Sequence, residues 1–182
     1  MAPYEPFDDE IEARGNTILV VEDALSRFSD DHRQRVRDAL AEYGIDDPEA
    51  ANWYPQEAEL NAFEMIAEDL EPHILDRLGE RVHAAAEWPG EIDSVEEALR
   101  SIDDAYQLNH RGGEIGYYSF EKTGDREGLV ECKNPYPCRF DRGLIRGVAQ
   151  EHSPVESFVF IEERADHCRR RGDDVCTYTV HW

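Results

Sequence analysis

The stretch Gly112-Gly-Glu-Ile-Gly-Tyr-Tyr-Ser-Phe-Glu-Lys122 marks a change in the hydrophobic period of the chain. Before it, apolar residues recur every three to four positions, as in helices; from Glu114 onward side chains alternate with a period of two, as in strands. A helical front followed by a back rich in strands indicates an α+β protein. We therefore expect a helical part, residues 30–110, packed on a mostly antiparallel sheet formed by residues 111–182.

The individual elements follow from the same periods. Four segments of the front part have a helical period: 30–43, 56–70, 72–88 and 94–108. In the back part, a β-β-α-β-β order is predicted from strands and a helix at 114–122, 129–133, 140–151, 155–162 and 175–182. The run Ile18-Leu-Val-Val21 fits a strand or the start of a helix. Residues 1–15 are acidic and contain two prolines, so we expect a flexible tail before a single domain over 16–182.

Charge is the most unusual feature of the composition. The 182 residues include 42 acidic and 19 basic side chains, which gives a net charge of −23, and only Lys122 and Lys133 are lysines. This composition is typical of a protein from a high-salt cytoplasm, where a Debye length of about 3 Å at 1 M salt weakens the repulsion between carboxylates. An acidic interaction surface on an ordinary protein is the alternative. The negative field argues against binding to nucleic acid or to an anionic membrane.

The location of the protein is predicted from its apolar runs and its start. No run approaches 18 apolar residues, and the first ten residues are acidic and lack the features of a signal peptide. We expect a cytoplasmic protein whose cysteines are reduced thiols or metal ligands.

The four cysteines lie in the last 51 residues, as two pairs joined by turn-rich segments. If the strands that flank these segments are neighbours, Cys132, Cys138, Cys168 and Cys176 converge at one end of the sheet. Four thiolates form a closed tetrahedral zinc site, so we predict structural zinc there, although iron has the same ligand set. Arg139 and the run 169–171 are expected to offset the negative charge of such a centre.

Other interpretations of the cysteines stay open at this point. They are ordinary buried thiols or one fortuitous disulfide in the simplest alternative, and three thiolates with His167 or Asp166 in another. A redox role is disfavoured because neither pair has the C-x-x-C spacing.

The residues Gly116, Cys138-Arg-Phe-Asp-Arg-Gly143, Cys168, Gly172, Cys176 and Tyr178 together resemble the 4-vinyl reductase domain family. These small ligand-binding domains also occur in phenol-responsive transcription activators, and their fold is related to small subunits of the TRAPP vesicle-tethering complex. The resemblance covers about residues 105–182. It implies a structural zinc ion on Cys138, Cys168 and Cys176 beside a pocket for an aromatic ligand. The family's glutamate ligand corresponds to Ala165 here, so Cys132 replaces it as the expected fourth ligand.

A ligand site is expected at the junction of the two parts. His110 and Arg111 could point into a cleft there, although a helix C-cap explains them equally well. Tyr117, Tyr118 and Phe120 could line a pocket for an apolar or aromatic ligand, although aromatic residues on strands are commonly core. No catalytic residue is singled out, because the chain has no G-x-S-x-G, H-E-x-x-H or P-loop motif.

We therefore predict a non-enzymatic cytoplasmic domain that binds a small molecule and acts as a sensor, with a protein as signalling partner. One alternative is a reductase-like enzyme of the 4-vinyl reductase type, which would need an electron source. The other is an assembly protein, which would expose an apolar patch and form dimers. A homodimer is compatible with both the sensory domain and the assembly protein.

Overall fold

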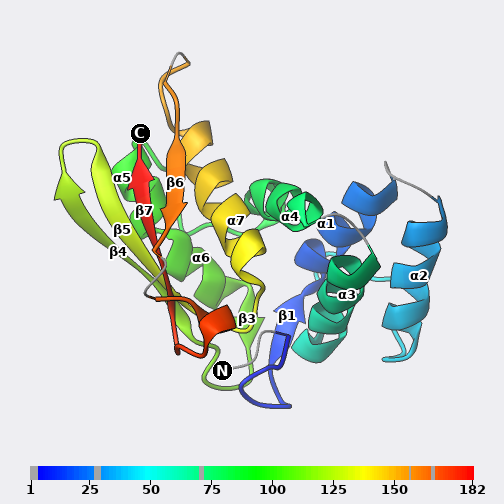
Figure 1. Cartoon of the computed structure of the whole chain (residues 1–182). Coiled ribbons are helices and arrows are strands. Elements are labelled where there is room, and N and C mark those ends of the chain that lie inside the picture. Colours follow the sequence, from blue (N-terminus) through cyan, green and yellow to red (C-terminus); the bar gives the residue numbers. More distant parts are fainter. Residues whose placement is uncertain (1–3, 27–29, 70–71, 156, 165–166) are drawn as a thin grey trace.

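The α+β class predicted from the sequence is confirmed by the computed structural model of the chain, which describes residues 4–26, 30–69, 72–155, 157–164 and 167–182 (Figure 1). Helices dominate the N-terminal part, and a four-stranded antiparallel sheet dominates the C-terminal part. The helices that lie apart from the large sheet are α1 (Gly15–Ser26), α2 (Asp30–Ala41), α3 (Gln56–Asp69) and α4 (His73–Ala85). The run Ile18–Val21 belongs to helix α1, so its apolar residues are helical and not a strand.

Helices α5 (Val95–Arg100) and α6 (Ile102–Leu108) occupy the segment in which one helix was expected. The Ser94 hydroxyl accepts a hydrogen bond from the Glu97 amide at 3.2 Å, as the capping-box pattern predicts. The prediction of one continuous helix over 94–108 was wrong at Ser101, which lies between the two helices.

A small sheet lies between the two parts and was not predicted. Its strands, in the order β2-β1-β3, are β1 (Glu12–Arg14), β2 (Trp53–Pro55) and β3 (His110–Arg111). Strand β1 pairs antiparallel with both neighbours, and Ile11 and Ala13 are buried in the core. Part of the segment expected to be a flexible tail is therefore a central strand.

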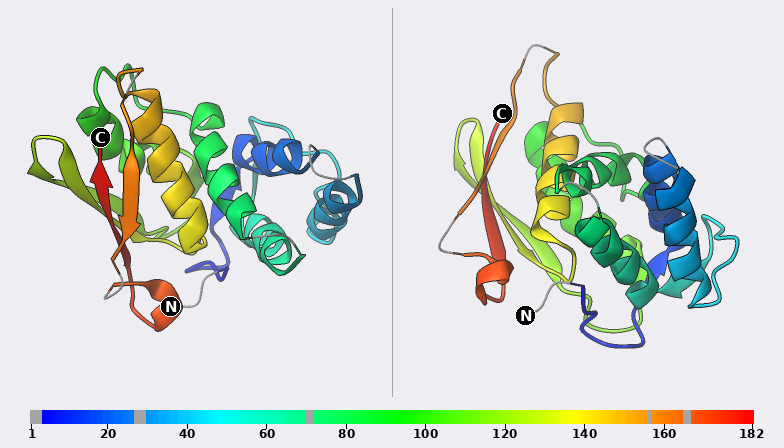
Figure 2. Two further views of the ribbon diagram at one scale, coloured as in Figure 1. Left: turned by 45° about the horizontal axis from the view of Figure 1, so that its top comes forward. Right: turned by 45° about the vertical axis from the view of Figure 1, so that its right-hand side comes forward.

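The large sheet has the strand order β4-β5-β7-β6, and its strands are all antiparallel to their neighbours. Its strands are β4 (Tyr117–Gly124), β5 (Glu127–Lys133), β6 (Phe160–Glu163) and β7 (Cys176–His181), and helix α7 (Cys138–Glu151) follows β5. This order along the chain confirms the predicted β-β-α-β-β half. Helix α7 lies between the sheet and helix α4 (Figure 2).

Helices α4 and α7 cross at very short distance. A Cβ atom on Gly143 would lie 1.9 Å from the Asp76 carbonyl oxygen, and one on Gly79 would lie 2.1 Å from the Phe140 carbonyl oxygen. Only glycine leaves room for the two backbones to approach this closely. Ion pairs of Asp76 with Arg139 and Arg142 border the crossing and fix the helical part against the sheet part.

Among the described residues, no helix is both long enough and apolar enough to cross a membrane.

Candidate functional site

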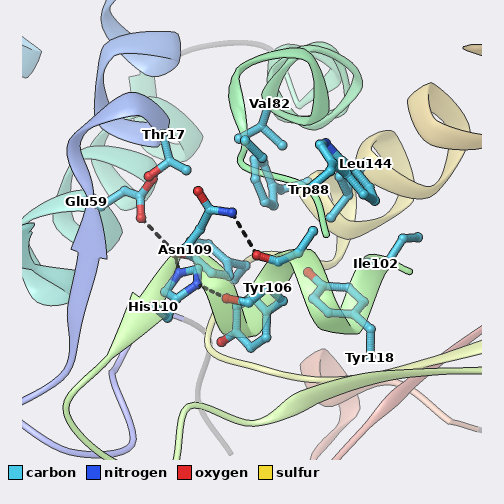
Figure 3. A pocket seen from close by; sticks show the side chains of 14 residues that line it. Thr17, Glu59, Val82, Trp88, Ile102, Tyr106, Asn109, His110, Tyr118 and Leu144 are labelled. Carbon is cyan, nitrogen blue, oxygen red and sulfur yellow. Dashed lines mark hydrogen bonds between the residues drawn. The ribbon is translucent and has the colours of Figure 1, made fainter. Parts of the chain in front are cut away.

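A cavity of about 50 Å³ lies where the helical part, helix α6 and the sheet part meet (Figure 3). Its walls come from α1, α3, α4, α6, α7 and strand β4, so residues distant in sequence enclose it. Most of the wall is apolar or aromatic. The lining residues are Thr17, Glu59, Val82, Ala86, Trp88, Ile102, Ala105, Tyr106, Asn109, His110, Tyr118, Tyr136, Phe140 and Leu144.

Three buried polar side chains form a hydrogen-bonded chain at one end of this cavity. The Tyr136 hydroxyl lies 2.7 Å from the Glu59 Oε2 atom and 2.7 Å from the His110 Nε2 atom. The other ring nitrogen of His110, Nδ1, lies 2.9 Å from the backbone carbonyl oxygen of Tyr106. Glu59 comes from helix α3, so the chain connects the helical part to the residues before helix α7 and in strand β3.

The hydrogens available along this chain of hydrogen bonds determine which of its groups are protonated. A carbonyl oxygen only accepts, so His110 Nδ1 carries a hydrogen and donates it to Tyr106. In a neutral imidazole, Nε2 then accepts the Tyr136 hydroxyl hydrogen. Tyr136 has no second hydrogen for Glu59, so the carboxyl group must be protonated and donate to Tyr136. An ionised Glu59 would accept from Tyr136 and would require a doubly protonated His110.

Burial favours the neutral forms of both Glu59 and His110. Desolvation raises the pKa of Glu59 from 4.5 to about 7, against the effect of its hydrogen bonds with Tyr136 and Thr17. Desolvation also lowers the pKa of His110 from 6.5 to about 4. Near neutral pH, His110 is therefore uncharged and Glu59 is partly protonated.

Of the five residues expected to bind ligand, the structure brings His110 and Tyr118 to the cavity. Arg111 is exposed, pairs with Glu12 at 2.6 Å and lies 4.5 Å from the ring centre of Trp53. The Tyr117 hydroxyl donates to Glu131 at 2.7 Å, away from the cavity. Phe120 lies farther along strand β4, with its ring centre 6.3 Å from that of Trp182.

Sequence reasoning missed Glu59 and Tyr136 as members of the site. Tyr136 lies in a segment with two prolines, where the sequence predicts only a turn-rich connection between cysteines. Glu59 carries no distinguishing sequence signal among 42 acidic residues.

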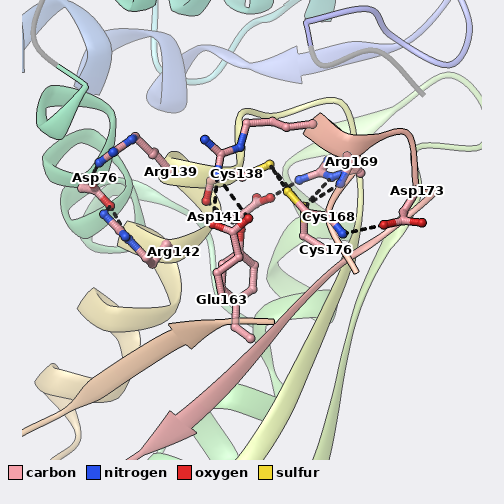
Figure 4. Close-up of polar contacts among 12 residues, drawn as sticks. Asp76, Cys138, Arg139, Asp141, Arg142, Glu163, Cys168, Arg169, Asp173 and Cys176 are labelled. Carbon is pink, nitrogen blue, oxygen red and sulfur yellow. Dashed lines mark hydrogen bonds and ion pairs between the residues drawn. The ribbon is translucent and has the colours of Figure 1, made fainter. Parts of the chain in front are cut away.

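Three of the four predicted cysteine ligands converge near the end of the large sheet (Figure 4). The Cys138 sulfur lies 3.2 Å from that of Cys176 and 3.9 Å from that of Cys168, and all three thiols are buried. Among the described residues, this is the group of ligand-type side chains whose atoms lie within 4.8 Å of one another. Cys132 is opposite Cys176 in the strand register but does not belong to the group. His167 is exposed, and Asp166 and Ala165 lie outside the described residues.

Arg169 stabilises negative charge beside the sulfur atoms, as the sequence predicts for this run. Its backbone N–H and side-chain Nε–H donate to the Cys176 sulfur at 3.4 and 3.3 Å, and its guanidinium forms a buried ion pair with Asp141. The pKa of Cys176 is lowered to about 5, because Cys138 donates a hydrogen bond to it and Arg169 is close. Burial raises the pKa of Asp141 to about 6, against the effect of Arg169. Arg170 instead pairs with Glu163 at 3.0 Å.

Comparison with known proteins gives an answer at the level of fold. No protein-family model and no curated relative matches the chain. Solved structures do: an H-NOX protein from S. oneidensis in the Fe(II) ligation state matches with a TM-score of 0.69 and 14% identity, over 92% of this chain and 95% of that one. An unliganded Fe(II) H-NOX protein from K. algicida matches with a TM-score of 0.65 and 13% identity, over 92% and 95%.

The fold is that of an H-NOX domain. A T. Tengcongensis H-NOX mutant gives the same result, with a TM-score of 0.63, 11% identity and coverage of 91% and 94%. A further neighbour with a TM-score of 0.66 is described in terms of haem distortion in the H-NOX family.

These matches correct two predictions. The resemblance to the 4-vinyl reductase family and to TRAPP subunits was wrong, because the structures that share this fold over nearly the whole chain are H-NOX domains. That resemblance rested on cysteine, glycine and tyrosine positions near the end of the chain, which do not determine the fold of the whole. The prediction of a zinc cofactor was also wrong: the H-NOX neighbours are haem proteins, and three sulfurs converge instead of four.

The residues of the H-NOX-like cavity do not fit a haem group. Its volume of about 50 Å³ compares with roughly 300–1,000 Å³ for pockets that hold organic ligands and cofactors. His110 lines the cavity, but both of its ring nitrogens already have hydrogen-bond partners. No Lys or Arg is among the lining residues, so the lining holds no cation that could pair with the two propionate groups of a haem.

Proposed function

We propose that this chain is a non-enzymatic sensory domain of H-NOX fold that binds a small molecule, other than haem, in its central cavity. The observation that carries the proposal is the cavity between the helical part and the sheet part, with aromatic walls and a buried polar end formed by Glu59, Tyr136 and His110. Ligand sites have this combination of apolar walls and a few polar groups that orient the ligand. An H-NOX neighbour of the same fold is described in an Fe(II)NO ligation state, which is consistent with a role in binding a small molecule.

The signalling partner of such a sensor would be a protein. The net charge of −23 opposes binding to polyanions, which leaves a protein as the recipient of a signal. The cavity contacts both parts of the fold, so a ligand there can change how the helical part packs on the sheet part.

The test measures the binding of small probes by nuclear magnetic resonance. It compares the wild-type chain with a variant in which a larger side chain fills the cavity. Ala105 is buried and lines the cavity, whereas Ala41 is exposed at the end of helix α2. Saturable binding of at least one probe from a set including methylammonium, methanol and phenol is expected in the wild-type chain. Ala105→Leu should abolish it and Ala41→Leu should not. If no probe binds, or if Ala105→Leu binds as well as the wild type, the proposal is wrong.

We also propose that Cys138, Cys168 and Cys176 form a ligand set for a thiophilic metal ion, whose identity is for measurement to decide. The support is the separation of the three sulfurs and the arginine donors at Cys176. Elemental analysis of protein purified without added metal should give about one ion per chain, and Cys138→Ser should lower that ratio. A ratio near zero in the wild type, with all thiols titratable in the folded protein, would reject this ligand set.

A further inference from the structure

Glu59 differs from the other buried acidic residues of the described chain. Glu22, Asp76 and Asp141 are also buried, and each has an arginine partner: Arg37 for Glu22, Arg139 and Arg142 for Asp76, and Arg169 for Asp141. Glu59 is 2% exposed and has hydrogen bonds with Tyr136 and Thr17, but no cation contributes to its environment. It is also the one of the four that lines the cavity. A buried carboxyl group without a cation is costly when ionised.

The walls next to Glu59 are suited to a positive charge. Five aromatic side chains line the cavity, and the face of an aromatic ring attracts a cation within about 6 Å of its centre. These five are Trp88, Tyr106, Tyr118, Tyr136 and Phe140.

The polar atoms of the wall have hydrogen-bond acceptors to spare but no free donors. The Tyr118 hydroxyl donates to Asp141 at 2.6 Å, and the Tyr106 hydroxyl donates to the backbone oxygen of Ile115. The Asn109 amide donates to the backbone oxygens of Glu87 and Ala105. A ligand that enters must therefore bring the donors itself, and N–H groups on a cation do so.

We propose that the cavity binds a small monovalent organic cation, a protonated amine of a few heavy atoms, with its N–H groups donating to Glu59 and its charge among the aromatic rings. This inference rests on the proposed ligand-binding function and names the chemical class of the ligand. The size limit follows from the cavity volume of about 50 Å³. In the ligand-free protein, the Glu59 carboxyl group has no cationic partner and is neutralised by a proton instead. Binding of the cation replaces this proton, which is released to solvent. An N–H group of the cation then donates to the Tyr136 oxygen in place of the carboxyl proton, so Tyr136 still donates to a neutral His110.

Proton release gives a test that needs no variant. Methylammonium chloride is titrated into the wild-type chain by calorimetry, at constant ionic strength, in two buffers with different ionisation enthalpies. Because the pKa of Glu59 is about 7, release should approach one proton at about pH 6 and fall toward zero by about pH 9. Methanol, the neutral analogue of similar size, should bind at least about tenfold more weakly.

A pair of variants assigns the release to Glu59. Glu59→Gln keeps a donor toward Tyr136 but cannot ionise, and it should weaken methylammonium binding by at least about tenfold and abolish the proton release. Glu57→Gln removes an exposed acid from the same helix and should bind as the wild type does.

Two results would overturn the inference in distinguishable ways. If methanol or phenol binds but methylammonium does not, the ligand is neutral. If methylammonium binds without proton release, Glu59 is not its counter-charge. Either result refutes the inference while the sensory proposal stands. If no probe binds at all, both the cation and the proposed function fail.

Discussion

Replacing Glu59 by glutamine should change how the stability of the protein depends on pH. The carboxyl group is fully buried, and its pKa rises from 4.5 to about 7 on folding. A group whose pKa is higher in the folded chain holds its proton more tightly there. The stability that this proton contributes is complete below about pH 4.5 and is lost as the pH rises through about 7.

The size of the effect follows from the shift of about 2.5 pKa units. One unit corresponds to about 1.4 kcal/mol, so ionisation of Glu59 lowers the free energy of unfolding by about 3 kcal/mol across this window. Glu59→Gln has no such titration. The stability of this variant, minus that of the wild type, should therefore rise by about 3 kcal/mol between about pH 4.5 and 8. Asp141 lies outside the hydrogen-bonded chain of Glu59 and titrates in both proteins, so its contribution cancels in the difference.

Urea unfolding at several pH values, with the linear extrapolation to water, measures this difference. Glu57→Gln is the matched control, because Glu57 is exposed on the same helix, and its difference curve should be flat. A curve for Glu59→Gln that is flat to within about 1 kcal/mol would show that Glu59 is not held neutral by burial, and the hydrogen count along the Tyr136 chain would then be wrong.

Three further outcomes test the fold and the absence of haem. Hemin added to the purified chain should give no saturable one-to-one complex with a sharpened Soret band; such a complex would refute the misfit. Gly143→Ala, whose new Cβ would lie 1.9 Å from the Asp76 carbonyl oxygen, should lower stability to urea by about 1–3 kcal/mol, whereas Gly90→Ala faces open space and should not. Asp141→Asn removes the carboxylate partner of the buried Arg169 charge and should cost about 3–5 kcal/mol, with less lost when Arg169→Met is added; equal losses would contradict this.

The elements that the sequence predicted are those whose periodicity is long enough to read. Strand β4 and helix α7 each extend over at least two full periods of alternation or helical turns, so their type was predictable. Strands β1 and β3 have three and two residues, too few to show a period. They form because Ile11 and Ala13 are buried between neighbours from distant parts of the chain, which is tertiary information.

The residues of the candidate site were also predictable only in part. Cys138, Cys168 and Cys176 could be predicted because the chain has only four cysteines and turn-rich segments join the members of each pair. Whether Cys132 joins them depends on side-chain directions at the end of a sheet, which spacing does not determine. Glu59 looks like any acidic residue of a helix surface until helix α3 is packed against the sheet part.

The cavity and the thiol cluster are joined by continuous buried contacts. Tyr118 lines the cavity and donates to Asp141, which pairs with Arg169, which in turn donates to the Cys176 sulfur at 3.3 Å. Each of these groups is buried, so losing a partner costs about 1–3 kcal/mol, and more where the group is charged. A ligand that displaces the Tyr118 ring must either preserve its bond to Asp141 or shift the ion pair with it.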